Sequence, residues 1–166
     1  AVLEDKNLVH GPIEALFTID EETGMTGAFG LKAGELEGDI LLNLDSETEG
    51  ELYVGCAGGI DATIRFDFTK EAMPASYSAF ELTVKGMKGG HSGMDIILGR
   101  GNANKTLFRI LKALEAVDVR LGNINGGSLR NAIPREAFCT IAVPTAKAQE
   151  AMNIVKELEA VVKSEL

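Results

Sequence analysis

The sequence has little of what disulfide-rich or membrane-spanning proteins contain. Cys56 and Cys139 are its two cysteines and form no CxxC pair, so a disulfide framework is not indicated and a reducing cytoplasm fits. No apolar run approaches the roughly 20 residues of a transmembrane helix. The first residues carry acids instead of the basic and apolar regions of a signal peptide. We expect a cytoplasmic protein that has no membrane partner.

Basic residues are scarce in the first part of the sequence. Residues 1–70 carry 15 acidic and 4 basic side chains, whereas residues 71–166 carry 10 acidic and 12 basic ones. An acidic surface repels phosphates, which argues against a nucleic-acid partner, and it suits divalent cations. On charge alone, however, a solvated acidic surface without a ligand is the better interpretation.

Short apolar runs in the first 70 residues indicate strands of a buried sheet. With 45% hydrophobic residues, the 166-residue chain can form a core. Near-continuous apolar runs at Ile13–Ile19 and Ile40–Leu44 are typical of parallel strands that are buried on both faces. Two further strands are predicted at Glu51–Cys56 and Ala62–Phe68. We therefore predict an α/β fold whose first domain, residues 1–70, contains part of a parallel sheet.

The pattern changes at residues 70–76, where we predict a domain boundary. Beyond it, the alternation of Phe80, Leu82 and Val84 with polar residues indicates a half-exposed strand. The elements predicted after this strand are a helix at 102–116, strands at 117–124 and 136–143, and a helix at 145–163 with Thr145 as its N-cap. Residues 71–166 thus form a predicted β-α-β-β-α unit, one strand short of a ferredoxin-like fold. We interpret the missing strand as a sign of truncation.

Acidic clusters follow the first two predicted strands directly. Asp20, Glu21 and Glu22 come after the first strand, and Asp45-Ser46-Glu47 come after the second. If the strands are parallel, both clusters lie at the same sheet edge, where ligands bind in open α/β sheets. Carboxylates gathered there repel one another unless a cation is present, so a metal site is one interpretation. Acids that merely cap loops are an equally good one. Beside a metal-bound water, one glutamate of the pair would act as a general base.

Histidine is too scarce for a complete zinc site of the hydrolase type. His10 and His91 are the two histidines, and neither has a second one at metal-ligand spacing. His91 lies in the glycine-rich loop GGHSG, where an exposed imidazole could donate to a developing oxyanion. A turn histidine that bonds the local backbone is the alternative. Downstream, Asn131 can donate and accept, and Arg130 or Arg135 could clamp a carboxylate.

A second motif competes with the metal hypothesis. The segment Gly99–Thr106 nearly matches the phosphate-binding pattern GxxxxGK[ST], and a predicted helix follows it. Asn104 replaces the second glycine, which places a side chain where a phosphate needs close access to the backbone. Nucleotide binding is therefore kept as a less favoured alternative.

Four segments together resemble aminoacylhistidine dipeptidases, which belong to the co-catalytic zinc aminoacylase and carboxypeptidase superfamily. The segments are TIDEETGMTGAFGL (18–31), GDILLNLDSETEGELYVGCAGGID (38–61), KGMKGGHSGMDIILGRGNANK (85–105) and NGGSLRNAIPREAF (125–138). The order DEE, GGHSG, NAIP is specific, although each motif alone is weak. The resemblance implies that residues 1–70 are part of a catalytic, zinc-binding domain and that residues 71–166 are part of a lid or dimerisation domain.

The resemblance also implies a role for each matching residue. Glu21 is expected to be the general base, and Glu22 and Asp45 are expected to bind zinc, one to each of two metal ions per subunit. His91 is expected to be the lid histidine, which reaches the partner's active site in a homodimer and polarises the scissile carbonyl. Asn131 matches a lid residue that contacts the substrate in the same way.

Arg135 is expected to contact a substrate carboxylate.

Several features of the family have no counterpart in this sequence. The upstream His-x-Asp motif, the bridging aspartate and the late C-terminal histidine are absent from this sequence. We therefore expect an internal piece of an enzyme that hydrolyses Xaa-His dipeptides by a zinc-activated water. By itself, the chain is expected to be inactive and to bind zinc weakly or not at all. The alternative is a non-catalytic dimerisation or interaction module.

Overall fold

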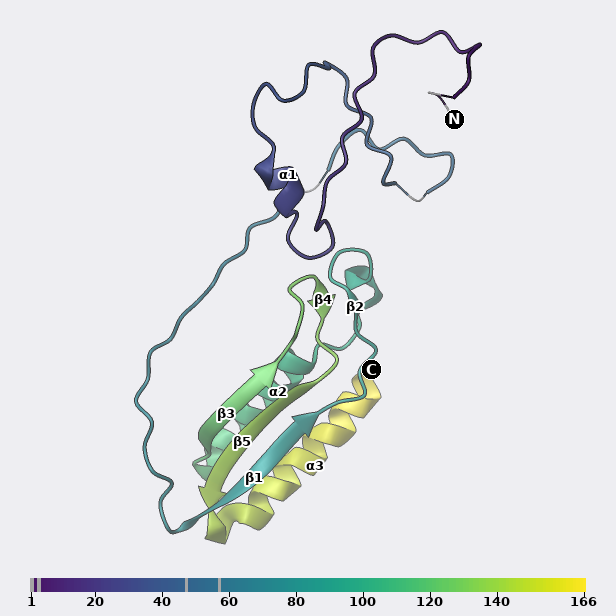
Figure 1. The fold of residues 1–166 in the computed structure, drawn as a ribbon. Helices are drawn as coiled ribbons and strands as arrows, with labels where there is room; N and C mark the ends of the chain where they lie inside the picture. Colours follow the sequence, from purple (N-terminus) through teal and green to yellow (C-terminus); the bar gives the residue numbers. More distant parts are fainter. Residues whose placement is uncertain (1, 3, 47, 57) are drawn as a thin grey trace. The chain divides into compact units, whose positions relative to one another are not determined.

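The computed structural model in Figure 1 describes residues 2, 4–46, 48–56 and 58–166. The chain divides into two compact units, Ala1–Ile64 and Arg65–Leu166. The domain boundary expected between residues 70 and 71 stays a prediction. Within the described residues, no helix combines the length and the apolar character needed to cross a membrane.

The first unit contains little regular structure. Among its described residues, the one helix is α1 (Thr26–Gly30), and no strand is formed. The parallel sheet predicted from the apolar runs of residues 1–70 is therefore wrong for this structure. A strand satisfies its backbone N–H and C=O groups through a neighbouring strand, and these runs pair with none. Their side chains stay in solvent, with Val54, Phe17 and Leu44 exposed by 100%, 90% and 89%.

The second unit is built on a three-stranded antiparallel sheet. Its strands are β1 (Tyr77–Val84), β3 (Arg120–Gly126) and β5 (Ala137–Pro144), in the order β1-β5-β3. Central strand β5 alternates buried and outward residues, and the register pairs Leu82 with Cys139 and Val84 with Ala137. One face of this sheet is therefore apolar and requires a cover.

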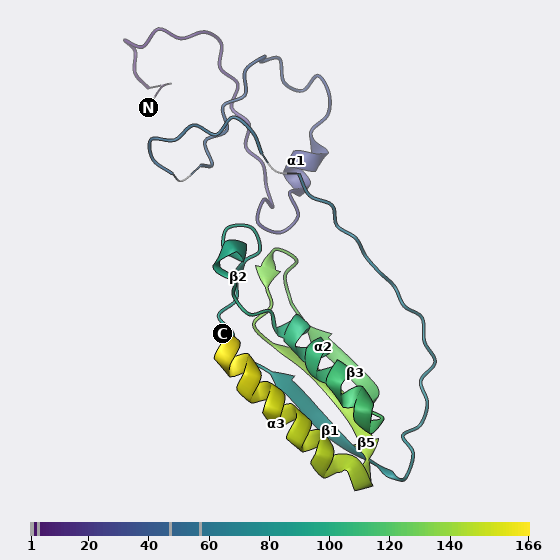
Figure 2. The ribbon, with the colours of Figure 1, turned by 180° about the vertical axis from the view of Figure 1, so that it is seen from behind.

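Two helices provide that cover. Helix α2 (Ala103–Leu114) connects β1 to β3, and α3 (Ala148–Glu165) follows β5. Figure 2 shows both helices on the same face of the sheet. Their apolar sides and the sheet enclose one core, which includes Leu107, Leu114 and Val143 at 0–1% exposure. This arrangement confirms the predicted β-α-β-β-α fold.

The start of α3 differs from the prediction. Thr145 opens a 3-10 turn (Thr145–Lys147), the helix begins at Ala148, and no side chain caps it. The Thr145 amide donates to the carbonyl of Ser76 at 2.9 Å, and its hydroxyl lies 2.8 Å from that of Ser78. Thr145 therefore bonds the start of β1 through its amide and its hydroxyl and does not cap the helix.

A second, smaller sheet lies beyond the main one. Strand β2 (Gly90–His91) pairs antiparallel with β4 (Ala132–Ile133), and the register sets His91 opposite Ala132. The loop after β2 contains the 3-10 turn Ile96–Leu98. This small sheet joins two segments that are about forty residues apart in the sequence, and it positions the candidate site.

Candidate functional site

The small sheet brings His91 and Asn131 together. The amide of Ser92, next to His91, donates to the carbonyl oxygen of Asn131 at 2.8 Å. Together with the β2–β4 pairing, this bond holds the glycine-rich loop against the NAIP segment. The sequence predicted both residues as site residues from separate motifs. The structure now places them in one local framework, and the role of each stays a prediction.

The imidazole of His91 is oriented by its own loop. Its Nδ1 accepts hydrogen bonds from the amides of Gly93 at 3.0 Å and Met94 at 3.2 Å. A ring nitrogen that accepts carries no proton, so the neutral ring holds its proton on Nε2. The ring is exposed, and Nε2 has no partner within the part of the chain that the structure describes. His91 is therefore arranged to donate one hydrogen bond outward.

Asp95 and Arg100 bond the backbone of this loop. The Asp95 carboxylate accepts from the backbone N–H of His91 at 2.8 Å, and one oxygen of it lies 3.2 Å from Nη1 of Arg100. The same Arg100 nitrogen donates to the carbonyl of Gly89 at 2.7 Å. Sequence reasoning missed both residues. An acid four positions after a glycine-flanked histidine was the available signal, but its partner Arg100 is identified by the fold alone.

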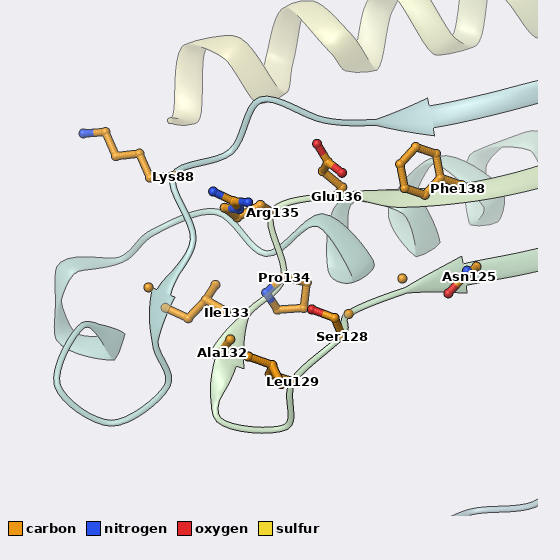
Figure 3. Close-up of a pocket in the computed structure, with 13 residues that line it drawn as sticks. Lys88, Asn125, Ser128, Leu129, Ala132, Ile133, Pro134, Arg135, Glu136 and Phe138 are labelled. Carbon is orange, nitrogen blue, oxygen red and sulfur yellow. The ribbon is translucent and has the colours of Figure 1, made fainter. Parts of the chain in front are cut away.

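A cavity of about 590 Å³ opens beside this framework (Figure 3). It is bounded by the end of β3, the β3–β4 loop, the NAIP segment and the residues before β2. The lining residues are Lys88, Gly90, Asn125, Gly126, Gly127, Ser128, Leu129, Ala132, Ile133, Pro134, Arg135, Glu136 and Phe138. Of the residues predicted to bind substrate, Arg135 lines this cavity and Asn131 does not.

Arg135 is held at the cavity by its aliphatic stem. A Cβ on Gly89 would collide with Cγ and Cδ of Arg135, so the stem lies directly on the Gly89 backbone. Gly89 has a φ of +68°, which favours glycine in any case. Lys88 adds a second cation to the lining and Glu136 adds an anion. A ligand carboxylate could be bound here by the guanidinium in bidentate fashion.

The phosphate-loop alternative does not fit the geometry of the Gly99–Thr106 segment. The Asn102 side chain accepts from the amide of Lys105 at 3.1 Å, and the amide of Ala103 donates to Pro134 at 2.9 Å. These are N–H groups that a phosphate at the helix start would need. The Asn104 side chain bonds the carbonyl of Gly126 at 3.4 Å. The segment is thus a capped helix start packed on the NAIP region.

Asp20 organises the turn that carries Glu21 and Glu22. Its φ is +62°, its carbonyl accepts from the amide of Gly24 at 3.0 Å, and its carboxylate accepts from the hydroxyls of Thr23 and Thr26. Aspartate tolerates this left-handed conformation better than most residues do. Glu21 and Glu22 are both exposed on the turn.

The predicted metal ligands are not assembled into a metal centre. Across residues 2, 4–46, 48–56 and 58–166, no group of three or more His, Cys, Asp or Glu side chains is placed to hold a metal ion. Asp45 is exposed, and Glu47 lies outside the described residues. His10 is exposed and contacts the carbonyl of Gly11 at 2.7 Å. The roles of Glu21, Glu22 and Asp45 stay predictions.

Comparison with known proteins identifies relatives of this arrangement. Residues 82–166 match the family model described as "Peptidase dimerisation domain". Over its whole length, the chain is 55% identical to the cytosol non-specific dipeptidase of Escherichia coli K12 and covers 34% of that protein. The crystal structure of aminoacylhistidine dipeptidase from Vibrio alginolyticus is 51% identical over 99% of this chain and 34% of its own, with a TM-score of 0.73. The chain thus spans about a third of the length of both relatives, and the resemblance predicted from its motifs is confirmed.

Proposed function

The chain belongs to the peptidase dimerisation domain family, and from this premise we propose that it forms part of a dipeptidase that acts as a homodimer. The relatives described above are named as dipeptidases. The observation that carries the proposal is the juxtaposition of His91 and Asn131 through the β2–β4 pair and the 2.8 Å bond between their segments. This bond holds the backbone of the Asn131 segment against the loop that carries the His91 donor, which supports a shared role for the two residues.

In this proposal, His91 and Asn131 act on the peptide bond. The Nε2–H of His91 donates to the scissile carbonyl oxygen and stabilises the negative charge that develops on it. Asn131 contacts the substrate beside it. Arg135, held by its stem on Gly89, binds the terminal carboxylate of the dipeptide. These residues act in the active site of the partner subunit, which makes the dimer necessary for catalysis.

The proposal assigns the acidic residues to the activation of the attacking water. Glu21 accepts a proton from the attacking water. Glu22 and Asp45 would each supply a carboxylate oxygen to one of two zinc ions, which would activate the attacking water. The proposed substrates are Xaa-His dipeptides, and the proposed setting is the cytoplasm. The residues described here do not fit a metal centre by themselves, since no group of three ligands is gathered. The remaining ligands would have to come from outside this chain.

The direct test uses the full-length enzyme that contains this chain and a panel of dipeptides with and without a C-terminal histidine. We expect hydrolysis that is lost with a chelator and restored by zinc. His91→Ala should lower kcat by about 10²–10³, and Glu21→Gln by about 10²–10⁴. His10→Ala is the matched control and should leave kcat unchanged. No hydrolysis of any dipeptide would overturn the proposal.

A complementation experiment tests whether His91 acts across the dimer. Each of the two inactive variants, His91→Ala and Glu21→Gln, keeps the residue that the other lacks. In mixed dimers, one of the two sites combines Glu21 from the first subunit with His91 from the second. Random mixing should therefore restore about a quarter of the wild-type activity. No recovery, with subunit exchange verified, would place His91 and Glu21 in the same subunit's site.

A non-catalytic interaction module is the second candidate. The family match covers residues 82–166, a span described as a dimerisation domain, whereas the described acidic residues form no metal centre. Sedimentation of the 166-residue chain shows whether it dimerises. If it forms a dimer and the full-length protein hydrolyses no dipeptide, the interaction module is favoured.

A further inference from the structure

We propose that Asp95 and Arg100 are positioning residues that hold the His91 loop in the conformation that presents Nε2–H. The proposal rests on the proposed function for its catalytic consequence, because only there does the outward donor meet a substrate. Its structural part stands on contacts within the second unit and can be measured without any substrate.

Asp95 hydrogen-bonds both polar groups of the His91 backbone. The Asp95 carboxylate accepts from the His91 N–H at 2.8 Å, and the Asp95 amide donates to the His91 carbonyl at 3.0 Å. One residue thus occupies both main-chain groups of the histidine. The loop between them is closed into a turn of fixed shape.

Arg100 in turn anchors the Asp95 carboxylate. Nη1 of Arg100 lies 3.2 Å from Oδ2 of Asp95 and donates to the Gly89 carbonyl at 2.7 Å. Both side chains are 28% exposed, so solvent screens the pair less than it screens an open surface pair. Arg100 therefore connects the Asp95 carboxylate to the carbonyl of Gly89, so that both residues next to Gly90 are held.

Gly90 shows how closely the pair lies against the main chain. Its φ is +145°, and a Cβ there would lie 2.5 Å from Oδ2 and 2.9 Å from Cβ of Asp95. The same Cβ would collide with Nη1 of Arg100. A side chain at this position is excluded, so the glycine leaves the space that the pair fills. The contact is part of the fold of the loop.

The closed turn also orients the imidazole ring of His91. With the turn closed, the amides of Gly93 and Met94 point at Nδ1 of His91. Two donors on Nδ1 select the tautomer with its proton on Nε2, which is the outward donor. A Cβ on Gly93 would lie 3.1 Å from Nδ1, so the ring rests on this glycine. Loosening the turn removes these donors and lets the ring sample both tautomers.

The test is NMR of the uniformly ¹⁵N-labelled 166-residue chain, with the histidine ring nitrogens and the backbone amides both observed. Only two rings give signals, and His10→Asn identifies that of His91. In alkaline buffer, where imidazole is neutral, wild type should show Nδ1 unprotonated and Nε2 protonated. Asp95→Ala and Arg100→Gln should move the chemical shifts of both ring nitrogens toward the averaged values of a free imidazole. They should also speed hydrogen exchange at Gly93 and Met94.

Graded and matched variants separate positioning from folding. Asp95→Asn keeps an acceptor for the His91 N–H but loses the charge, so its shift should be smaller than that of Asp95→Ala. Arg100→Lys keeps the charge, so its His91 signals should stay closer to those of wild type than the signals of Arg100→Gln do. Arg120→Gln is the control, since Arg120 forms an exposed pair with Asp118 at 3.4 Å. Unchanged β5 amide signals certify the fold of each variant.

The outcomes are distinct from those of the proposed function. In the full-length enzyme, Asp95→Ala should lower kcat by about ten- to a hundred-fold through misplacement of His91, with KM little changed. Unmoved His91 signals in folded Asp95→Ala and Arg100→Gln would overturn the inference, as would an equal shift in Arg120→Gln. If the signals move while His91→Ala keeps full activity, the positioning stands and the proposed function fails.

Discussion

The two units contain similar apolar side chains but bury them very differently. Every buried core residue of the described chain lies between Leu82 and Ala151, and none of the described residues of the first unit is buried. In the second unit, β1 and β3 both pair with the central strand β5, and two helices cover the sheet. The apolar runs of the first unit have no paired neighbour. An apolar run thus indicates that a segment can be buried as a strand. Whether the strand forms depends on a neighbouring strand that pairs with its backbone.

The largest contrast is expected in the reactivity of the two cysteines. Cys139 lies in β5 with 3% of its surface exposed, and burial raises the pKa of its thiol, so that the reactive thiolate is scarce. Cys56 is exposed. Iodoacetamide should modify Cys56 at least about a thousand-fold faster, because Cys139 reacts only when its domain opens. Peptide mass spectrometry over time measures both rates, and equal rates in denaturant are the control. Equal rates in native buffer would break the comparison.

A matched pair of leucine truncations is expected to show the next largest contrast. Leu114 is 0% exposed in the core, whereas Leu52 is 95% exposed in the first unit. Leu114→Ala should lower the free energy of unfolding by about 2–5 kcal/mol, because it leaves a cavity. Leu52→Ala should change it by less than about 0.5 kcal/mol. Urea denaturation followed by circular dichroism checks both, and similar losses would show that the first unit has a core of its own.

Two asparagines compare the same kind of bond in the two units. The Asn102 side chain accepts from the amide of Lys105 at 3.1 Å and caps α2. The Asn43 side chain accepts from the amide of Asp45 at 2.9 Å, outside any helix. Asn102→Ala should cost about 1 kcal/mol of stability, and Asn43→Ala should have no measurable effect on the unfolding midpoint. A loss of equal size in both variants would contradict this difference.

The smallest effect is expected at the exposed pair between α2 and α3. The hydrogen bond from Arg109 lowers the pKa of Glu165, with the charge of Arg109 as a lesser cause. A carboxyl with a lowered pKa stabilises the folded state above its ordinary pKa, and this contribution fades as the pH falls through the lowered value. Glu165→Gln should therefore destabilise slightly at about pH 7 and less at about pH 3. Thermal melts at both pH values measure the difference. A larger effect in acid would reverse the assigned sign.

Much of the second unit could be predicted from its periodicity. The helix expected at 102–116 is observed as Ala103–Leu114, and the strand expected at 136–143 is observed as Ala137–Pro144. The strand expected at 117–124 begins later, at Arg120. A 3-10 turn at Glu115–Val117 and a left-handed residue at Asp118, with φ +59°, occupy the preceding positions. Periodicity reports which residues face the core, but it does not locate such turns.

The residues of the candidate site could be predicted from the sequence, but the contacts that hold them in place could not. His91 and Asn131 could be named from glycine-rich and polar motifs, because exposed functional groups on such loops are recognisable in sequence. The bond between their segments links residues 92 and 131, and Arg100 reaches back to Gly89. Contacts of this kind depend on how the loops fold over one another. Local sequence contains no direct record of them.

The sequence by itself determined the motifs, the family resemblance and the alternation of elements in residues 77–166. These depend on local composition and on periods of two and 3.6 residues, which any one segment displays. Only the tertiary structure decided that the runs in residues 2–64 remain unpaired and that Thr145 fastens β1. It also set the proton of His91 on Nε2. Each of these outcomes depends on which groups from distant segments meet, and hydrogen bonds are satisfied by neighbours in space.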